Sequence, residues 1–205
     1  MKRAKSVLDT LEDVYVEDRA AWRRWLRKHH ASSPGIWLVY DRKTSRDDRL
    51  AYADAVEEAL CFGWIDSTTR PVDADHYKQL FTPRKPKSVW SKLNKERVAR
   101  LIADRRMQPA GLAAIDVARA NGSWTALDAV ESFVIPADLE AALAANPRAK
   151  ANFEAFSPSA RKAYLYRLNA AKRPETRAAR LKEIVRLAAA NQRIPSPRPS
   201  PAAPR

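Results

Sequence analysis

The residues best suited to bind or transform a ligand lie in residues 52–94. This stretch contains the only cysteine, one of the three histidines, two of the six tryptophans and the start of the densest basic run. Residues 78–106 hold ten basic and two acidic side chains, whereas residues 47–75 hold two basic and eight acidic ones. The net charges of +8 and −6 could neutralise each other across the fold, or the basic block could bind an anion.

The basic block favours an anion site at a helix N-terminus. We predict Ser88 as the N-cap of a helix that runs to about Arg105, whose free first-turn amides and dipole favour a bound anion. Its buried side should carry Trp90, Leu93, Val98, Leu101 and Ile102. The four glycines are isolated, so the glycine-rich loops of nucleotide sites are absent. The candidate ligand-binding residues are Trp64, Asp66, Ser67, Arg84, Lys85, Lys87, Ser88, Trp90, Ser91, Lys92 and Asn94.

Asp66 is the candidate catalytic residue. It could act as a general base, or it could form an ion pair with Arg84, which we favour. Acid–base catalysis also needs a second positioned group, and the sequence offers only His76 nearby. Trp64 and Trp90 could stack on the ring of a ligand, although tryptophans in so apolar a motif are more often part of a core.

Metal, redox and cofactor chemistry find little support in the composition. Three histidines and one cysteine argue against a metal site, and we expect no cofactor. A single cysteine excludes an internal disulfide. Cys61 lies beside the buried stripe of its helix, so we predict an inert packed thiol rather than a nucleophile.

The elements that must position these residues indicate an α+β fold with a three- or four-stranded antiparallel sheet. Trp22, Trp25, Leu26 and His29 mark one helical stripe. Gly63 should adopt the left-handed conformation that ends the next helix, and two prolines should prevent the last strand from continuing at Thr82. The predicted strands are 36–40, 64–72 and 76–81. The predicted helices of this part are one that runs from about residue 17 to a break at 33–35, and three more at 52–62, 88–105 and 110–120.

The chain divides into four predicted parts. Residues 1–16 form a loosely held N-terminal arm, residues 17–128 the α+β domain, residues 129–193 a helical region, and residues 194–205 a disordered tail with five prolines. Prolines at plausible first-turn positions indicate the helices of the third part. These are 137–145, 148–156, 159–171 and 175–191.

The net charge of +14, from 38 Lys and Arg against 24 Asp and Glu, favours anionic partners such as phosphorylated ligands, nucleic acid or lipid headgroups. No zinc finger or RNP-type signal supports nucleic acid. No apolar run approaches the ~18 residues that a membrane-spanning helix needs. Acidic residues interrupt the start where a secretory signal would be apolar, so we expect a cytoplasmic protein.

One set of stretches carries a family resemblance. It consists of Tyr52 and residues 22–26 (WRRWL), 35–38 (GIWL), 57–67 (EEALCFGWIDS), 81–84 (FTPR), 88–94 (SVWSKLN), 107–111 (MQPAG) and 171–177 (AKRPETR). These stretches resemble the YdeI/OmpD-associated family, also called bacteriocin-protection proteins. The resemblance implies an N-terminal α+β portion, similar to YjbR/CyaY-like domains, and a small helical portion. It implies no reaction, cofactor or catalytic residue, and the lack of a signal peptide argues against contact with a porin.

These observations favour a non-enzymatic, cytoplasmic binding or stress-protection protein. Its anion-binding cleft should lie between the turn at residues 63–67 and residues 82–94. The alternative is an enzyme that acts on a phosphorylated or otherwise anionic small molecule through Asp66 and Arg84. A nucleic-acid-binding protein is a third possibility.

Overall fold

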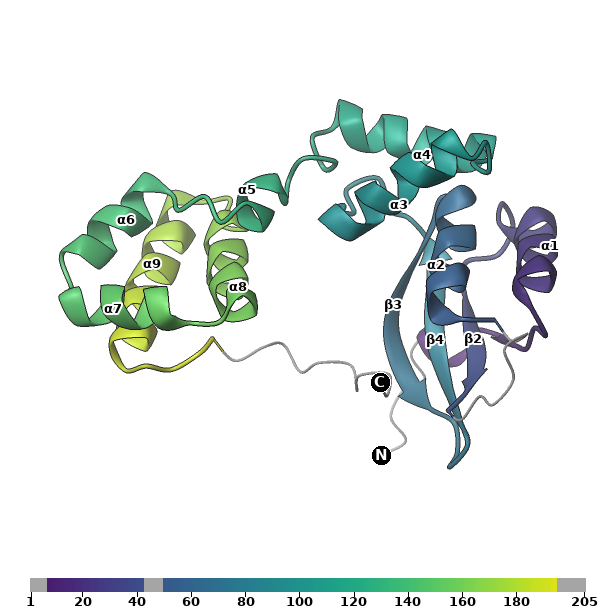
Figure 1. The fold of residues 1–205 in the computed structure, drawn as a ribbon, viewed down its shortest axis with the longest axis horizontal. Helices are drawn as coiled ribbons and strands as arrows, with labels where there is room; N and C mark the ends of the chain where they lie inside the picture. The colour runs from purple at the N-terminus through teal and green to yellow at the C-terminus, as the bar shows by residue number, and fades with distance from the viewer. Residues whose placement is uncertain (1–6, 43–49, 195–205) are drawn as a thin grey trace. The chain divides into compact units, whose positions relative to one another are not determined.

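The structure, a computed structural model, describes residues 7–42 and 50–194. It has the predicted α+β architecture (Figure 1), and it divides into an α+β unit that extends to Trp124 and a helical unit that begins at Thr125. The predicted tail lies outside the described residues except for Ile194. None of the described helices is long and apolar enough to cross a membrane.

The α+β unit contains a four-stranded sheet with the strand order β1-β2-β4-β3. Strand β2 pairs antiparallel with β4, and β4 pairs antiparallel with β3. Strand β1 runs parallel to β2, so the sheet is mixed rather than purely antiparallel as predicted. The strands are β1 (Asp13–Val14), β2 (Ile36–Asp41), β3 (Trp64–Pro71) and β4 (His76–Pro83).

The described part of the N-terminal arm is held against the sheet, which corrects the prediction of a loose segment. The 3-10 turn η1 (Val7–Asp9) precedes β1, and the indole N–H of Trp37 donates to the Leu8 carbonyl at 2.8 Å. Ion pairs of 2.6 Å (Arg70–Asp9) and 2.7 Å (Lys78–Asp13) add to this attachment. The 3-10 turn and the two-residue strand are too short to give a periodic signal, so these long-range contacts were not predictable from local pattern.

Helices α1 (Arg19–His29) and α2 (Tyr52–Cys61) share one core with the sheet. Asp18 caps α1 by accepting a hydrogen bond from the Ala21 amide at 2.6 Å. Trp22 and Leu26 of α1 are fully buried, and Trp25 packs beside them. Gly63 has a φ of +74° after the end of α2, as predicted.

Strand β4 continues through Thr82 and Pro83, contrary to the prediction that it would stop at Phe81. The pairing with β2 already ends at Ile36 and Phe81, whereas Pro83 is paired only with Trp64 of β3. A proline is tolerated there because the strand has a single neighbour at that position.

The next helix begins three residues later than predicted. Helix α3 (Lys92–Ala103) is capped by Ser91, whose hydroxyl accepts from the Asn94 amide at 3.3 Å, and not by Ser88. Trp90, Val98 and Leu101 are buried, but Leu93 and Ile102 are 52% and 44% exposed, which corrects the predicted stripe. Helix α4 (Pro109–Ala120) ends at Asn121-Gly122, as predicted.

The helical unit has its own core, built by four helices after the short α5 (Asp128–Glu131). Tyr164 lies at its centre, stacked on Phe156 at 5.6 Å and edge-on to Phe153 at 5.9 Å between ring centroids. The predicted first-turn prolines are observed at Pro147, Pro158 and Pro174. The helices are α6 (Ala137–Ala144), α7 (Pro147–Ala155), α8 (Pro158–Asn169) and α9 (Pro174–Ala189).

Leu60 tests the α+β core because its side chain is fully buried on α2. Leu60→Ala should lower the free energy of unfolding by ~2–5 kcal/mol, since it leaves a cavity in a packed core. The exposed Leu93→Ala is the control and should change it by less than ~0.5 kcal/mol. Urea titration measures both, and equal effects would contradict the assigned faces.

The bidentate ion pair between Arg177 and Asp138 tests the helical unit. Arg177 donates from Nε at 2.7 Å and from Nη2 at 2.9 Å, and these bonds lower the pKa of Asp138. A depressed carboxyl pKa stabilises the fold above the unfolded value near ~3.9 and loses that effect as the pH falls through the folded pKa. Asp138→Asn should therefore lower the free energy of unfolding by ~1 kcal/mol or less at pH 7.

The difference between Asp138→Asn and the unmutated protein should shrink below about pH 4 in a pH series of urea titrations. Glu140→Gln, an exposed carboxylate on the same helix, is the control and should have little effect. A loss that stays constant from pH 7 to pH 3 would show that the ion pair does not contribute.

Candidate functional site

Asp66 is held by two polar side chains on the sheet face that α2 covers. The Tyr52 hydroxyl, at the start of α2, donates to Asp66 Oδ2 at 2.7 Å, and Gln79 Nε2 donates to the same oxygen at 3.2 Å. Gln79 Nε2 also donates to the Ser67 carbonyl at 2.8 Å. A β-bulge between Asp66 and Thr69 re-aims the strand at this point. Asp66 is therefore a positioned carboxylate.

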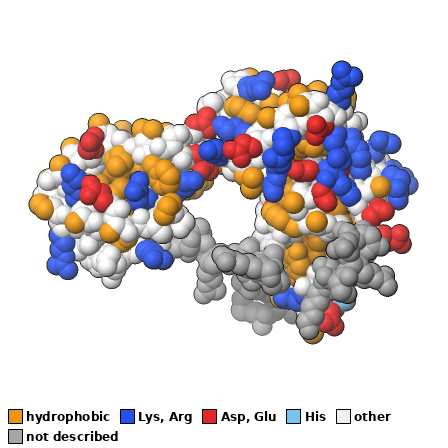
Figure 2. All heavy atoms as spheres, viewed as in Figure 1, with side chains coloured by type: hydrophobic (Ala, Val, Ile, Leu, Met, Phe, Trp, Pro, Cys, Tyr) orange, Lys and Arg blue, Asp and Glu red, His pale blue; other side chains and the backbone are white. Residues whose placement is uncertain are grey.

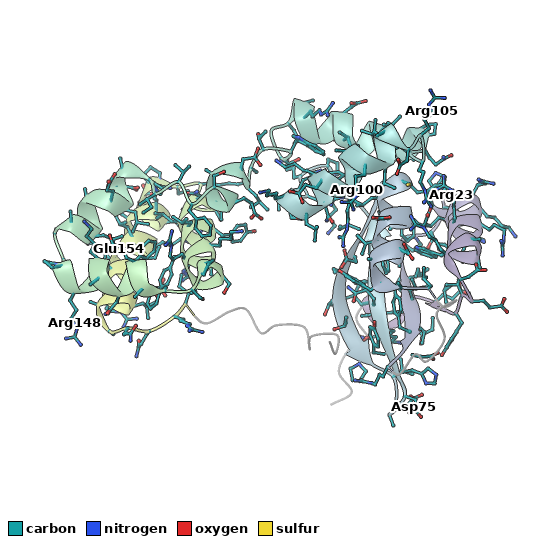
Figure 3. All side chains as sticks on the ribbon, viewed as in Figure 1. Arg23, Asp75, Arg100, Arg105, Arg148 and Glu154 are labelled. Atoms are coloured by element: carbon teal, nitrogen blue, oxygen red, sulfur yellow. The ribbon has the colours of Figure 1, made fainter. Side chains whose placement is uncertain are left out.

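The predicted partners of Asp66 are wrong. Among the described residues no ion pair joins Asp66 to Arg84, although the Asp66 charge partly opposes the lowering of that arginine's pKa by burial. His76 pairs instead with Asp73 at 2.8 Å and Asp41 at 3.1 Å, at the β3–β4 turn where Figure 3 labels Asp75. His76 thus lies about 16 Å along β4 from the residue that pairs with Asp66, at ~3.3 Å per residue.

Tyr40 contributes a buried hydroxyl to the same face, and no local sequence pattern indicated it. Its side chain stacks on Tyr77 with 5.2 Å between centroids, and its hydroxyl has no hydrogen-bond partner in the described part of the chain. Burial, and then the charges of Tyr77 and Asp66, raise the pKa of Tyr40 well above its usual value. Burial and the bond to Asp66 likewise raise the pKa of Tyr52. Both phenols are therefore neutral near pH 7.

Arg84 lies immediately after β4, with its guanidinium 3.5 Å from the centroid of Trp90. Nη1 donates to the Val89 carbonyl at 3.3 Å, whereas Nε is buried and has no partner within the described residues. Burial lowers the pKa of Arg84 to about 10, although Asp66 opposes the shift. The guanidinium is thus charged at pH 7 but poorly compensated.

Arg97 of α3 is a second cation of this region that sequence reasoning missed. Its Nη1 donates to the Asn94 amide oxygen at 3.0 Å, which gives the predicted site residue Asn94 a role in orienting it. The Arg97 charge acts on Tyr52, where it opposes the rise in the tyrosine's pKa. No carboxylate pairs with Arg97 among the residues that the structure describes.

Neither predicted stacking tryptophan offers a free face. Trp64 and Trp90 are each 1% exposed. Trp64 packs against Trp25, and its indole N–H donates to the His30 carbonyl at 3.1 Å. Trp90 is covered by Arg84 and lies 5.0 Å from the ring of Trp124. Both are core residues, which confirms the interpretation favoured from the sequence, and the alternative that they frame a ligand ring is wrong.

The remaining predicted residues lie in the β4–α3 connection and the first turn of α3. Lys85 and Lys87 are exposed, and the Ser88 amide donates to the Lys85 carbonyl at 2.9 Å, which closes a turn instead of beginning a helix. Lys92 is exposed and is 3.9 Å from Glu96. These lysines add positive charge around Arg84.

A buried ion-pair network on α2 was also missed by sequence reasoning. Glu58 is completely buried, and its carboxylate accepts from Arg19 Nε at 2.6 Å, from Arg23 Nη1 at 2.6 Å and from Arg106 Nη2. Arg19 also pairs with Asp54 and Glu57. Arg19 and Arg23 lie one helical turn apart on α1, and the next helix in the chain is acidic. This spacing is the sequence signal that could have indicated the ion pairs.

The network connects α1, α2 and α3. Arg23 of α1 and Arg100 of α3 extend toward α2 in Figure 3, where Glu57 pairs with Arg100 at 3.1 Å. Figure 2 shows Lys and Arg side chains beside Asp and Glu side chains over these helices. The acidic block therefore does neutralise part of the basic block, through Arg100 and Arg106, and it also pairs with arginines of α1 that lie outside that block.

Cys61 lies next to this network and is fully buried. Burial raises the pKa of the thiol, and a hydrogen bond from Arg23 only partly opposes the shift. This environment disfavours a thiolate, in agreement with the predicted inert thiol. Within the described ranges, no group of three or more His, Cys, Asp or Glu residues could hold a metal ion.

Glu58→Gln tests the network. It should lower the free energy of unfolding by ~3 kcal/mol or more, because the arginines lose their buried counter-charge. Glu57→Gln is the matched control on the same helix, and it should cost less than Glu58→Gln, because Glu57 is 19% exposed and one of its two partners, Arg100, is 62% exposed. If urea titration shows that the two variants lose the same free energy of unfolding, the burial of Glu58 does not increase its contribution to stability.

Comparisons with known proteins identify a family in each half of the chain. Residues 14–114 match a family described only as a domain of unknown function (DUF8412). Residues 132–191, which include helices α6 to α9, match the family described as "Bacteriocin-protection, YdeI or OmpD-Associated". No curated protein and no solved structure matched the chain. The helical unit is therefore similar, over residues 132–191, to the bacteriocin-protection, YdeI or OmpD-associated family.

Proposed function

We propose that the protein is a non-enzymatic, cytoplasmic binding protein whose α+β unit holds a small anion between Arg84 and Arg97. The observation that carries the proposal is Arg84, a largely desolvated guanidinium that has no carboxylate partner within the described chain. A buried charge without a counter-charge destabilises a fold. A bound anion offsets that cost, so this site gains more from ligand binding than an exposed arginine would.

The surroundings of Arg84 support an anionic ligand. Lys85 and Lys87 are exposed beside it, and Lys92 occupies the first turn of α3. The N-terminal end of α3 adds the positive end of a helix dipole. Together they create a positive potential that attracts anions and accelerates their association.

Binding is better supported than catalysis. Asp66 is positioned, but its neighbour Tyr52 has a raised pKa and holds its proton near pH 7. No histidine lies beside Asp66 to complete an acid–base pair, since His76 is bound at the β3–β4 turn. Nucleic-acid binding loses its best argument because the tryptophans of the motif are buried and have no face for a base.

The family description of the helical unit suggests the purpose of this binding. That description names bacteriocin protection. We therefore place the anion site in a stress-protection protein, in which the α+β unit recognises the ligand.

Arg84→Gln tests the proposed function. Inorganic phosphate, titrated at constant ionic strength, should raise the melting temperature of the unmutated protein, and a ligand at ~100 times its dissociation constant adds ~2.7 kcal/mol. Arg84→Gln and Arg97→Gln should each remove most of this response, whereas Lys182→Gln, which changes an exposed lysine of α9 in the helical unit, should keep it. A melting temperature that ignores phosphate and sulfate, or an unchanged response in Arg84→Gln, would overturn the proposal.

A further inference from the structure

Asp66 and Arg84 are opposite charges that influence each other without pairing. The Asp66 carboxylate acts on the pKa of Arg84, yet no ion pair joins them. Asp66 Oδ2 accepts both of the carboxylate's hydrogen bonds, from Tyr52 and Gln79, and Oδ1 accepts none among the described residues. An ionised carboxylate has about four acceptor positions, so Oδ1 can still accept from a charged donor.

The phenol rings provide the second part of the observation. Tyr40 is 8% exposed, and its hydroxyl is without a partner inside the described chain. Its ring is stacked on Tyr77, and Tyr52 touches Asp66 directly. Tyrosine rings and a carboxylate with a free oxygen form the surroundings that recognise an ammonium group. The Tyr40 oxygen can accept one of the ammonium protons, which would satisfy a buried polar group.

A simple anion does not match this arrangement fully. Bound at Arg84, it brings a second negative charge toward Asp66, and the repulsion weakens binding. A ligand that also carries an ammonium group pairs with Asp66 and with Arg84 at once. In such a ligand the ammonium group is attracted to Asp66, which would only repel a simple anion.

We propose that the ligand of this site is a small zwitterion, with a phosphate or carboxylate bound by Arg84 and Arg97 and a primary ammonium group bound by Asp66 and the Tyr40 hydroxyl. This proposal rests on the proposed anion site and adds the class of ligand. The shared chemistry is an amine two or three bonds from an anionic group, as in aminoalkyl phosphates and amino acids.

Two matched pairs of probes test the proposal on the full chain by isothermal titration calorimetry. O-phosphoethanolamine is compared with inorganic phosphate, and β-alanine with propionate, at equal ionic strength. At least one zwitterion should bind ten-fold or more tightly than its matched anion, and the stronger pair shows whether the site prefers phosphate or carboxylate. Ethanolamine alone should bind weakly.

Two variants locate the ammonium group. Asp66→Asn keeps an acceptor for Tyr52 but removes the charge, so it should abolish the ten-fold preference while phosphate binds as tightly as before or more tightly. Tyr40→Phe removes only the unpartnered hydroxyl, and it should reduce the preference without lowering the melting temperature of the free protein. Circular dichroism checks that both variants are folded.

The outcomes separate the two proposals. If phosphate binds but neither zwitterion binds more tightly than its matched anion, the site takes simple anions and the zwitterion proposal is overturned. If the preference survives in Asp66→Asn, the ammonium group does not lie at Asp66 and the proposal is also overturned. If no anion and no zwitterion binds, the proposed function itself fails.

Discussion

The buried carboxylate of Glu58 is the interaction on which the α+β unit depends. It accepts hydrogen bonds from Arg19 and Arg23 of α1 and from Arg106, which follows α3. A lone carboxylate at this depth would be strongly destabilising, but three guanidinium groups satisfy it. The network fixes the register of the helices that cover the sheet, and thereby the position of Tyr52 at the start of α2. Because Tyr52 holds Asp66, the candidate site depends on the same interaction.

The two polar regions of this unit differ in how completely their charges are compensated. Around Glu58 the described carboxylates and arginines pair with each other, which is typical of a structural network. Around Asp66 the opposite holds, since Arg84 Nε and the Tyr40 hydroxyl are buried without partners in the described structure. Buried polar groups without partners are rare in proteins and call for an explanation such as a ligand.

Sequence reasoning predicted the elements well where periodicity was strong and failed where contacts were long-range. Helix α2, its glycine end and the proline-initiated helices of the helical unit followed from local pattern. Ser88 was mistaken for a cap because Ser91 offers the same chemistry three residues later. Residues 84, 85, 87 and 92 were correctly placed near one helix end, but Tyr40, Arg97 and Glu58 come from other elements. Their positions depend on tertiary packing, which no local window contains. The likeness to YjbR/CyaY-like domains remains a prediction.

The short strand β1 protects the sheet from self-association. Without β1, the largely apolar strand β2 (Ile36–Asp41) would present a row of unpaired amides and carbonyls. Such an open edge is a template for another chain. Within the described ranges Asp13 and Val14 pair with this edge, and contacts of Leu8 and Asp9 add to the attachment. Loss of the segment before α1 would therefore uncover a β edge and remove Val14 from the core, so the solubility of this protein depends on a few residues outside its main helices.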